Sequence, residues 1–135
     1  MTASDSRPAG DARHAGDAIR ERAPHVLEVY QQTRDTVLES GIVEPELKAL
    51  CARFLAEDDE VLAHATDPGH YSERQRAALA WTEAIAWDSE RAGDEVWRRL
   101  HSAFTEPELV ELGYSIAITL GQQHWLSTLG VVEQP

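Results

Sequence analysis

Residues 101–130 read HSAFTEPELVELGYSIAITLGQQHWLSTLG, and this stretch decides the fold class. It begins a helix with a capping box, in which the side chains of Thr105 and Glu108 each accept the other's backbone N–H, and Pro107 sits in the first turn. Apolar residues then recur as far as Leu129. The stretch therefore predicts a long, largely apolar helix, with a bend near Gly121.

Similar signals precede this helix along the chain. Pro45 fits a first helical turn, Pro24 either starts or kinks the first predicted helix, and Ser72 with Gln75 makes a second capping box. Ser40-Gly41 is a stop signal that separates the first two helices. The further predicted helices cover residues 17–39, 44–56, 58–65, 72–87 and 93–104.

No stretch alternates strictly between apolar and polar residues, and no Asn-Gly hairpin signal occurs. The sequence therefore predicts an all-α fold, a compact bundle of about six helices. Residues 1–16 have almost no large apolar side chain, so we expect a disordered N-terminal tail there. Residues 17–135 are expected to form a single helical domain.

The chain is strongly acidic. Its 135 residues include 24 Asp and Glu against 12 Lys and Arg, which gives a net charge of −12. Such a surface repels phosphate backbones and anionic lipids, so neither nucleic acid nor a membrane is expected as the main partner. The sequence also has no apolar run of about 20 residues and no hydrophobic signal core after Met1, which favours a cytoplasmic location.

Two stretches carry a family resemblance. Residues 71–85 read YSERQRAALAWTEAI, and residues 101–117 read HSAFTEPELVELGYSIA. With residues 120–129 they resemble the carboxymuconolactone decarboxylase and alkylhydroperoxidase-D superfamily, in which a Ser-Glu-Arg-x-x-Ala-Leu helix precedes a Phe-x-x-x-Glu-Leu-Val-Glu-Leu helix. The likeness extends over roughly residues 43–130. It implies an oligomeric, alkylhydroperoxidase-D-like helical fold, and either peroxide reduction through a Cys-x-x-Cys pair or lyase and isomerase chemistry on small carboxylated lactones.

The chain departs from the redox branch of that family. A gap-free comparison puts Val61 and His64 where the two cysteines would lie, Ala49 near the helper glutamate and Pro68 at the usual histidine. The lone thiol of Cys51 has no resolving partner in the chain. A thiol peroxidase acting through Cys51 is therefore the weaker alternative, and a member without redox cysteines is expected.

Four residues are candidates for acid–base catalysis. His64 ends a predicted short helix, and His124 interrupts the most apolar helix, where a polar side chain needs a partner. Tyr114 could orient a carbonyl group, and Glu83 would act as a general acid if burial raised its pKa. Each also has a structural interpretation: a helix-end histidine, a hydrogen-bonded histidine, a core tyrosine or a solvated glutamate.

Candidate substrate-binding residues are Trp81, Trp125, Gln123 and His70. The chain has four tryptophans, which is many for its length. At helical spacing they are expected first in the core, and alternatively as walls of a cavity for a flat, apolar ligand.

The first functional hypothesis is a cofactor-free enzyme. It would perform decarboxylation, elimination, isomerisation or cyclisation on a small organic acid, lactone or polycyclic substrate, with no cofactor and no metal. Self-association is expected because the C-terminal helix is more apolar than one small monomer can cover. The alternative is a non-catalytic helical module, either an oligomeric scaffold or a small-molecule binder.

Overall fold

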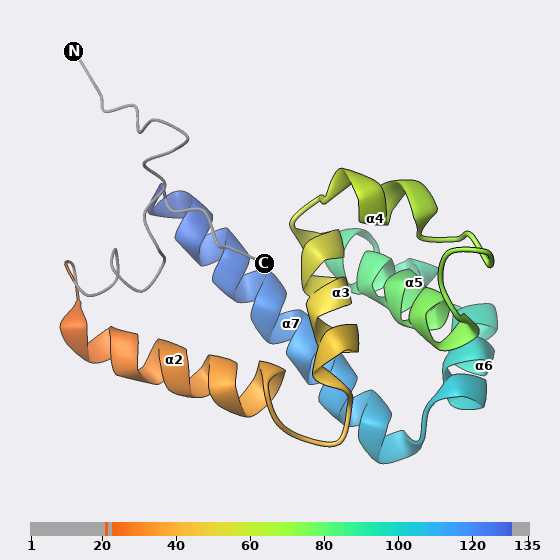
Figure 1. The fold of residues 1–135 in the computed structure, drawn as a ribbon, viewed down its shortest axis with the longest axis horizontal. Coiled ribbons are helices and arrows are strands. Elements are labelled where there is room, and N and C mark those ends of the chain that lie inside the picture. Colours follow the sequence, from red (N-terminus) through yellow and green to blue (C-terminus); the bar gives the residue numbers. More distant parts are fainter. Residues whose placement is uncertain (1–20, 22, 131–135) are drawn as a thin grey trace, which may run out of the picture.

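The computed structural model describes residue 21 and residues 23–130 of the chain, and within them it is entirely helical. Figure 1 shows these helices in chain order. Six α-helices and one short 3₁₀ helix make up the described part: α2 (Pro24–Leu38), α3 (Pro45–Leu55), α4 (Asp59–His64), α5 (Glu73–Trp87), η2 (Ser89–Arg91), α6 (Asp94–Ala103) and α7 (Glu106–Thr128). The expected all-α fold is thus confirmed for these residues, while the expected tail at 1–16 lies outside them.

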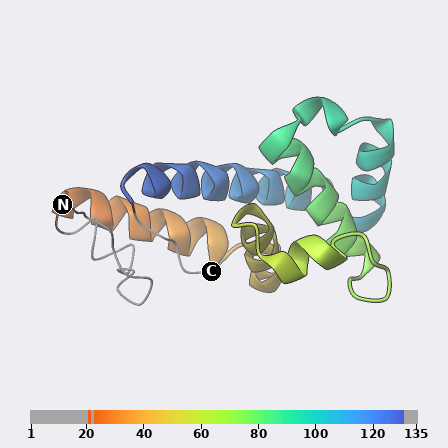
Figure 2. The same cartoon turned by 90° about the horizontal axis from the view of Figure 1, so that it is seen from above.

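The helix ends follow the sequence signals. Pro24 and Pro45 each begin a helix, and both predicted capping boxes form, with Ser72 and Thr105 as the N-caps. Gly41 adopts a φ of 105°, a left-handed conformation that side-chain-bearing residues rarely adopt, in the turn between α2 and α3. Helix α7 continues through Gly121 as one element, and Figure 2 shows no kink at the expected bend.

The main core lies where α3, α5 and α7 meet, with α4 and α6 packed around them. Leu47, Leu79, Leu100 and Leu112 are among the side chains that are almost wholly buried there. On α3 the buried apolar residues Leu47, Leu50, Cys51, Phe54 and Leu55 recur at helical spacing, so this helix buries one stripe against its neighbours.

Helix α2 forms an arm with the C-terminal half of α7. Figures 1 and 2 both show α2 lying alongside that half of α7, away from α5 and α6. A small second apolar cluster of Leu27, Tyr30 and Leu126 joins the two helices. Helix α2 also contacts α3.

The expectation that the tryptophans fill the core is wrong. Trp87, Trp97 and Trp125 are all exposed, and Trp81 is only partly buried. Leucine, alanine and other aliphatic residues make up most of the centre instead, and Trp81 packs against its edge. Among the described helices, none is long and apolar enough to cross a membrane.

Candidate functional site

A pocket of about 360 Å³ lies between α2, α3 and α7. Three alanines spaced three and four residues apart form its floor: Ala49 and Ala52 on α3, and Ala56 directly after its end. Their small side chains leave room that larger residues would fill. The volume falls within the range of small-molecule sites, which is about 300–1,000 Å³.

Polar side chains from α2 and α7 also line this pocket. Arg34 comes from α2, while Thr119, Gln122 and Gln123 come from α7. Gln123 Nε2 donates a hydrogen bond to the carbonyl oxygen of Ala52 at 3.2 Å, which ties α7 to the floor. The pocket thus combines an apolar floor with amide, hydroxyl and guanidinium groups. Leu38, Glu39, Pro45, Glu46 and Lys48 complete its lining.

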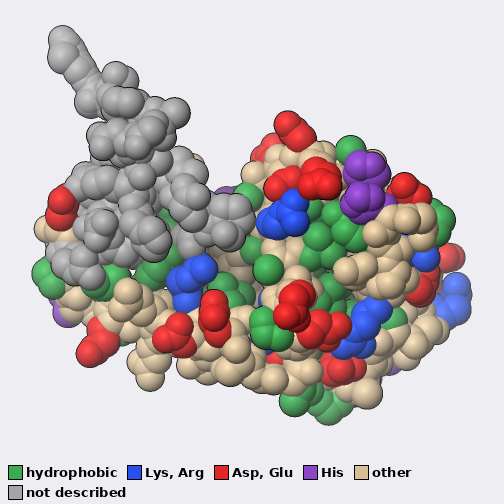
Figure 3. Space-filling model, in the orientation of Figure 1, with side chains coloured by type: hydrophobic (Ala, Val, Ile, Leu, Met, Phe, Trp, Pro, Cys, Tyr) green, Lys and Arg blue, Asp and Glu red, His purple; other side chains and the backbone are tan. Residues whose placement is uncertain are grey.

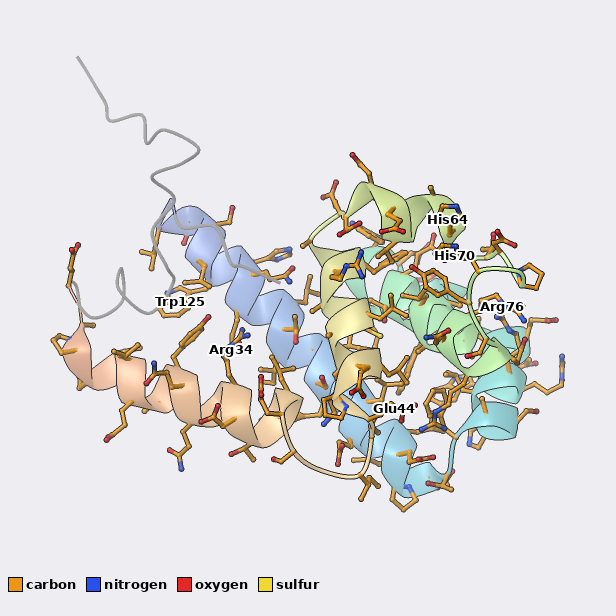
Figure 4. All side chains as sticks on the ribbon, in the orientation of Figure 1. Arg34, Glu44, His64, His70, Arg76 and Trp125 are labelled. Carbon is orange, nitrogen blue, oxygen red and sulfur yellow. The ribbon has the colours of Figure 1, made fainter. Side chains whose placement is uncertain are left out.

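Arg34 brings a cation to this wall. Figure 4 shows its side chain extending from α2 toward α7, on the same side as Trp125. The guanidinium carbon lies 5.8 Å from the centre of the Tyr30 ring, within cation–π range. A guanidinium carries five N–H donors in a planar fork, which matches the two oxygens of a carboxylate.

Lys48 also reaches this region, but its ammonium group is committed to the protein. The side chain is fully buried, and Nζ lies 2.7 Å from the carbonyl oxygens of Val37 and Ser40 and 2.8 Å from Glu111 Oε2. An ammonium group has three N–H donors, so these partners use all of them. Lys48 therefore holds the α2–α3 turn against α7 and has no donor left for a ligand.

Glu111 completes this anchor. Its carboxylate accepts the backbone N–H groups of Ile42 at 3.0 Å and Val43 at 2.8 Å, in addition to Lys48. Desolvation raises the pKa of Glu111, but the hydrogen bonds from Lys48, Val43 and Ile42 outweigh it and lower the pKa to about 2. The group is therefore a carboxylate at neutral pH.

A second, shallower hollow of about 580 Å³ lies between α5, α6 and α7. We call it the aromatic groove; it is lined by Trp81, Trp97, His101, Glu106, Leu109, Val110 and Gly113. The Trp81 and Trp97 rings are 5.7 Å apart at a tilt of 57°. Gly113 lets Trp81 lie against α7, since a Cβ there would come within 2.7 Å of the indole ring.

An ion pair lies at the edge of the aromatic groove. His101 Nδ1 is 2.9 Å from the carbonyl oxygen of Trp97, and Nε2 is 3.1 Å from Glu106 Oε2. The Trp97 carbonyl and then the Glu106 carboxylate raise the pKa of His101. Both ring nitrogens face acceptors, so the doubly protonated imidazolium ring is favoured.

Two of the residues predicted from sequence lie together. The rings of His64 and His70 stack with centroids 4.0 Å apart, and His64 Nδ1 is 3.0 Å from the carbonyl oxygen of Glu60. Figure 3 shows a histidine patch on this face of the molecule, and Figure 4 labels its two members beside the α4–α5 loop. The patch lies outside both hollows described above.

The other predicted acid–base residues lie elsewhere. Glu83 lines a surface hollow between α5 and α6 together with Arg76 and Arg99. Tyr114 and His124 are exposed on α7. Within one chain, the structure therefore does not bring His64, Glu83, Tyr114 and His124 to one place, and their catalytic roles stay predictions.

The predicted substrate-binding residues are also divided. Gln123 lines the α2–α3–α7 pocket and Trp81 lines the aromatic groove. Trp125 packs against Tyr30 with ring centroids 6.2 Å apart, where α2 meets α7. The spacing of these residues along the sequence could not show that they would lie in different places, because it does not indicate which helices pack against each other.

Sequence reasoning missed Arg34, Lys48 and the His101–Glu106 pair. A signal existed for Lys48, because it lies three residues before Cys51 and seven before Leu55 on the apolar face of its helix. Arg34 and His101 gave no such signal, because each lies on a mostly polar stretch whose packing partner comes from a distant helix.

Cys51 is buried, and burial raises its thiol pKa to about 11, although a hydrogen bond with Thr82 opposes that rise. At neutral pH the group is a thiol shielded from solvent, whereas peroxide chemistry needs an accessible thiolate. Nothing in this geometry favours the peroxidase alternative.

The described residues contain no cluster of three or more His, Cys, Asp or Glu side chains placed to hold a metal ion. In the comparisons with known proteins, no family model, no curated protein and no solved structure matches the chain.

Proposed function

We propose that the chain is a helical module that binds a small carboxylated compound in the pocket between α2, α3 and α7. The observation that carries this proposal is that Arg34 and the three alanines Ala49, Ala52 and Ala56 line the same pocket. The ligand's carboxylate would pair with the guanidinium group, and a compact apolar body would cover Ala49 and Ala52.

The polar groups of α7 suit the same class of ligand. Thr119, Gln122 and Gln123 offer hydroxyl and amide groups to a carboxylate oxygen or to a second polar substituent. Glu39 and Glu46 also line the pocket, so a ligand with several negative charges would be repelled. A monocarboxylate with an apolar ring or short chain is the best match.

We favour a non-catalytic small-molecule binder over the cofactor-free enzyme that the sequence also suggests. General acid–base catalysis needs its groups within hydrogen-bond reach of one reacting molecule, and the four candidates are dispersed in a single chain. A lyase or isomerase related to carboxymuconolactone decarboxylase stays a prediction.

The test is isothermal titration calorimetry with benzoate and with benzamide, its uncharged isostere. We expect benzoate to bind and benzamide to bind at least 10-fold more weakly. Charge-assisted hydrogen bonds contribute about 1.5–3 kcal/mol, so Arg34→Gln should weaken benzoate binding roughly 10- to 100-fold. Ala52→Leu should also weaken binding, because the added carbons fill the floor.

Matched controls are available on the surface. Arg98 lies on α6 with its side chain 67% exposed, away from the pocket, so Arg98→Gln should leave benzoate binding unchanged. Ala63→Leu on α4 is the control for Ala52→Leu. The proposal fails if benzoate and benzamide bind alike, or if Arg34→Gln and Arg98→Gln have equal effects.

A further inference from the structure

One side of α7 is exposed along its length. Val110 is 75% exposed and Tyr114 is 58% exposed, and Ala117, Gly121 and His124 are exposed beyond them. Figure 2 shows α2 on one side of α7 and no described helix along the other side of its C-terminal half. We call these five residues the α7 seam.

The spacing of the seam matches helix pairing. Its residues are separated by four, three, four and three positions, which is the pattern that keeps one stripe facing a partner helix. Gly121 leaves open space, because a Cβ there would meet nothing within 4 Å. A bulky side chain from another helix can therefore approach the α7 backbone at this point.

The distribution of charge on the chain favours a second copy of the same chain as the partner of the seam. The chain carries a net charge of −12, and 27% of its residues are charged, yet residues 112–130 contain no Asp, Glu, Lys or Arg. Two copies of so acidic a protein repel each other across most surfaces. The uncharged side of α7 is a surface on which a second copy can approach without placing carboxylates against carboxylates.

We infer that two copies of this chain pair through antiparallel α7 helices along the seam. A two-fold axis at Ala117 places Val110 opposite His124 and Tyr114 opposite Gly121, and each of these contacts occurs twice. The tyrosine ring then lies over the position that has no side chain. The antiparallel arrangement also sets each helix N-terminus beside the C-terminus of the other, which is electrostatically favourable.

This pairing adds a residue to the aromatic groove. Val110 belongs to both the seam and the groove, so His124 of the second copy comes beside Val110. Glu106 lies one helical turn before Val110 and carries an exposed carboxylate. The groove of each copy is thus completed by an imidazole from the other, close to Trp81, His101 and Glu106.

The seam and the proposed ligand pocket are independent. Thr119 lies on the opposite side of α7 from the seam, with Gln122 and Gln123 on either flank of it, at about 100° of rotation per residue. Loss of dimerisation would therefore leave benzoate binding intact, and the reverse also holds.

The first experiment measures mass by sedimentation equilibrium across a concentration series. We expect wild type at twice the monomer mass, and Ala117→Arg at the monomer mass, because the substitution places two cations together at the axis. Ala63→Arg, which replaces another exposed alanine, on α4, should remain dimeric. Circular dichroism checks that both variants fold. A monomeric wild type at tens of micromolar, or a dimeric Ala117→Arg, overturns the inference.

The second experiment tests the register by oxidative cross-linking. A mixture of Val110→Cys and His124→Cys chains should form a disulfide-linked heterodimer, while neither variant alone should link to itself. In the antiparallel pair two copies of residue 110 are about 21 Å apart along the helix axis. Self-linking of Val110→Cys would indicate parallel helices, and no linkage in the mixture would also contradict the pairing. Cys51 is buried, so the single variants measure any background.

Discussion

Lys48 Nζ lies 2.8 Å from Glu111 Oε2, and this ion pair joins α3 to α7 beneath the α2–α3 turn. The lysine side chain is wholly buried, while the glutamate side chain is 25% exposed. Removing one partner of a buried pair leaves the other without compensation for its lost hydration. The pair and its backbone partners therefore hold the α2–α3 turn against α7, next to the ligand pocket.

Lys48→Met should destabilise the protein by about 3 kcal/mol, because it leaves Glu111 and two backbone carbonyls without their donor. Urea denaturation followed by circular dichroism measures the change. Arg98→Met removes an exposed pair with Glu95 and should change the free energy of unfolding by less than about 0.5 kcal/mol. Similar losses in the two variants would show that the buried pair has no special role.

Stability should fall in acid through Glu111. Its pKa is about 2 in the folded protein against an ordinary value of 4.5, so the unfolded chain takes up the proton first. The resulting stabilisation is complete above pH 4.5 and is lost progressively as the pH falls toward 2. Glu111→Gln should therefore flatten this part of the pH profile.

The stability of the Glu111→Gln variant should still fall somewhat in acid, because other carboxylates also have lowered pKa values. The pKa values of Glu44 and Glu108 are lowered mainly by hydrogen bonds from Arg74, and that of Asp58 mainly by Arg53. A Glu111→Gln profile that overlays the wild-type profile between pH 2 and pH 5 would contradict the assignment to Glu111.

Arg74 should not tolerate replacement by lysine. It binds both carboxylate oxygens of Glu44 at 2.9 Å, Glu108 at 3.0 Å and the carbonyl oxygen of Ala103 at 2.6 Å. A lysine keeps the charge but lacks the planar fork, so we expect Arg74→Lys to lower the free energy of unfolding by about 1–2 kcal/mol. Arg76→Lys, which keeps a pair with Glu73, should have a smaller effect in the same urea experiment. Equal effects would count against this role.

Gly41 should be irreplaceable by alanine. Its φ of 105° disfavours any side chain, and a Cβ would lie 2.5 Å from the Glu111 carboxylate. We expect Gly41→Ala to cost more than about 2 kcal/mol through strain and loss of the anchor. Gly93 has ordinary backbone angles and open space, so Gly93→Ala should cost less than about 1 kcal/mol. Thermal denaturation of the two variants compares their losses of stability. A loss for Gly41→Ala as small as that for Gly93→Ala would contradict the proposed role of the Glu111 contacts in holding this turn.

Local signals in the sequence were enough for the helices. Pro45, Ser72 and Thr105 begin helices in the structure because prolines and capping side chains act on backbone groups within a few residues. Gly41 lies in the turn between α2 and α3 for a similarly local reason, since glycine readily adopts its positive φ. These signals do not depend on which helices later pack together.

The candidate sites depended on contacts between distant residues. Lys48 meets Glu111 across 63 positions, and Trp81 meets Trp97 only because Gly113, on a third helix, leaves space for its ring. Periodicity shows that a helix has a buried stripe, but not which stripe of another helix it meets. Arg34 could therefore be read as a solvated arginine in the sequence, although it lines a pocket in the structure.

The central claim is that a carboxylate binds beside Arg34 and the α7 glutamines. The most direct measurement is an ¹⁵N NMR titration with benzoate that follows the side-chain amides of Gln122 and Gln123. We expect saturable shifts of both amide signals with benzoate; these shifts should be much smaller with benzamide and absent in Arg34→Gln. Unmoved glutamine amides at saturating benzoate, or shifts confined to residues outside α2, α3 and α7, would contradict it.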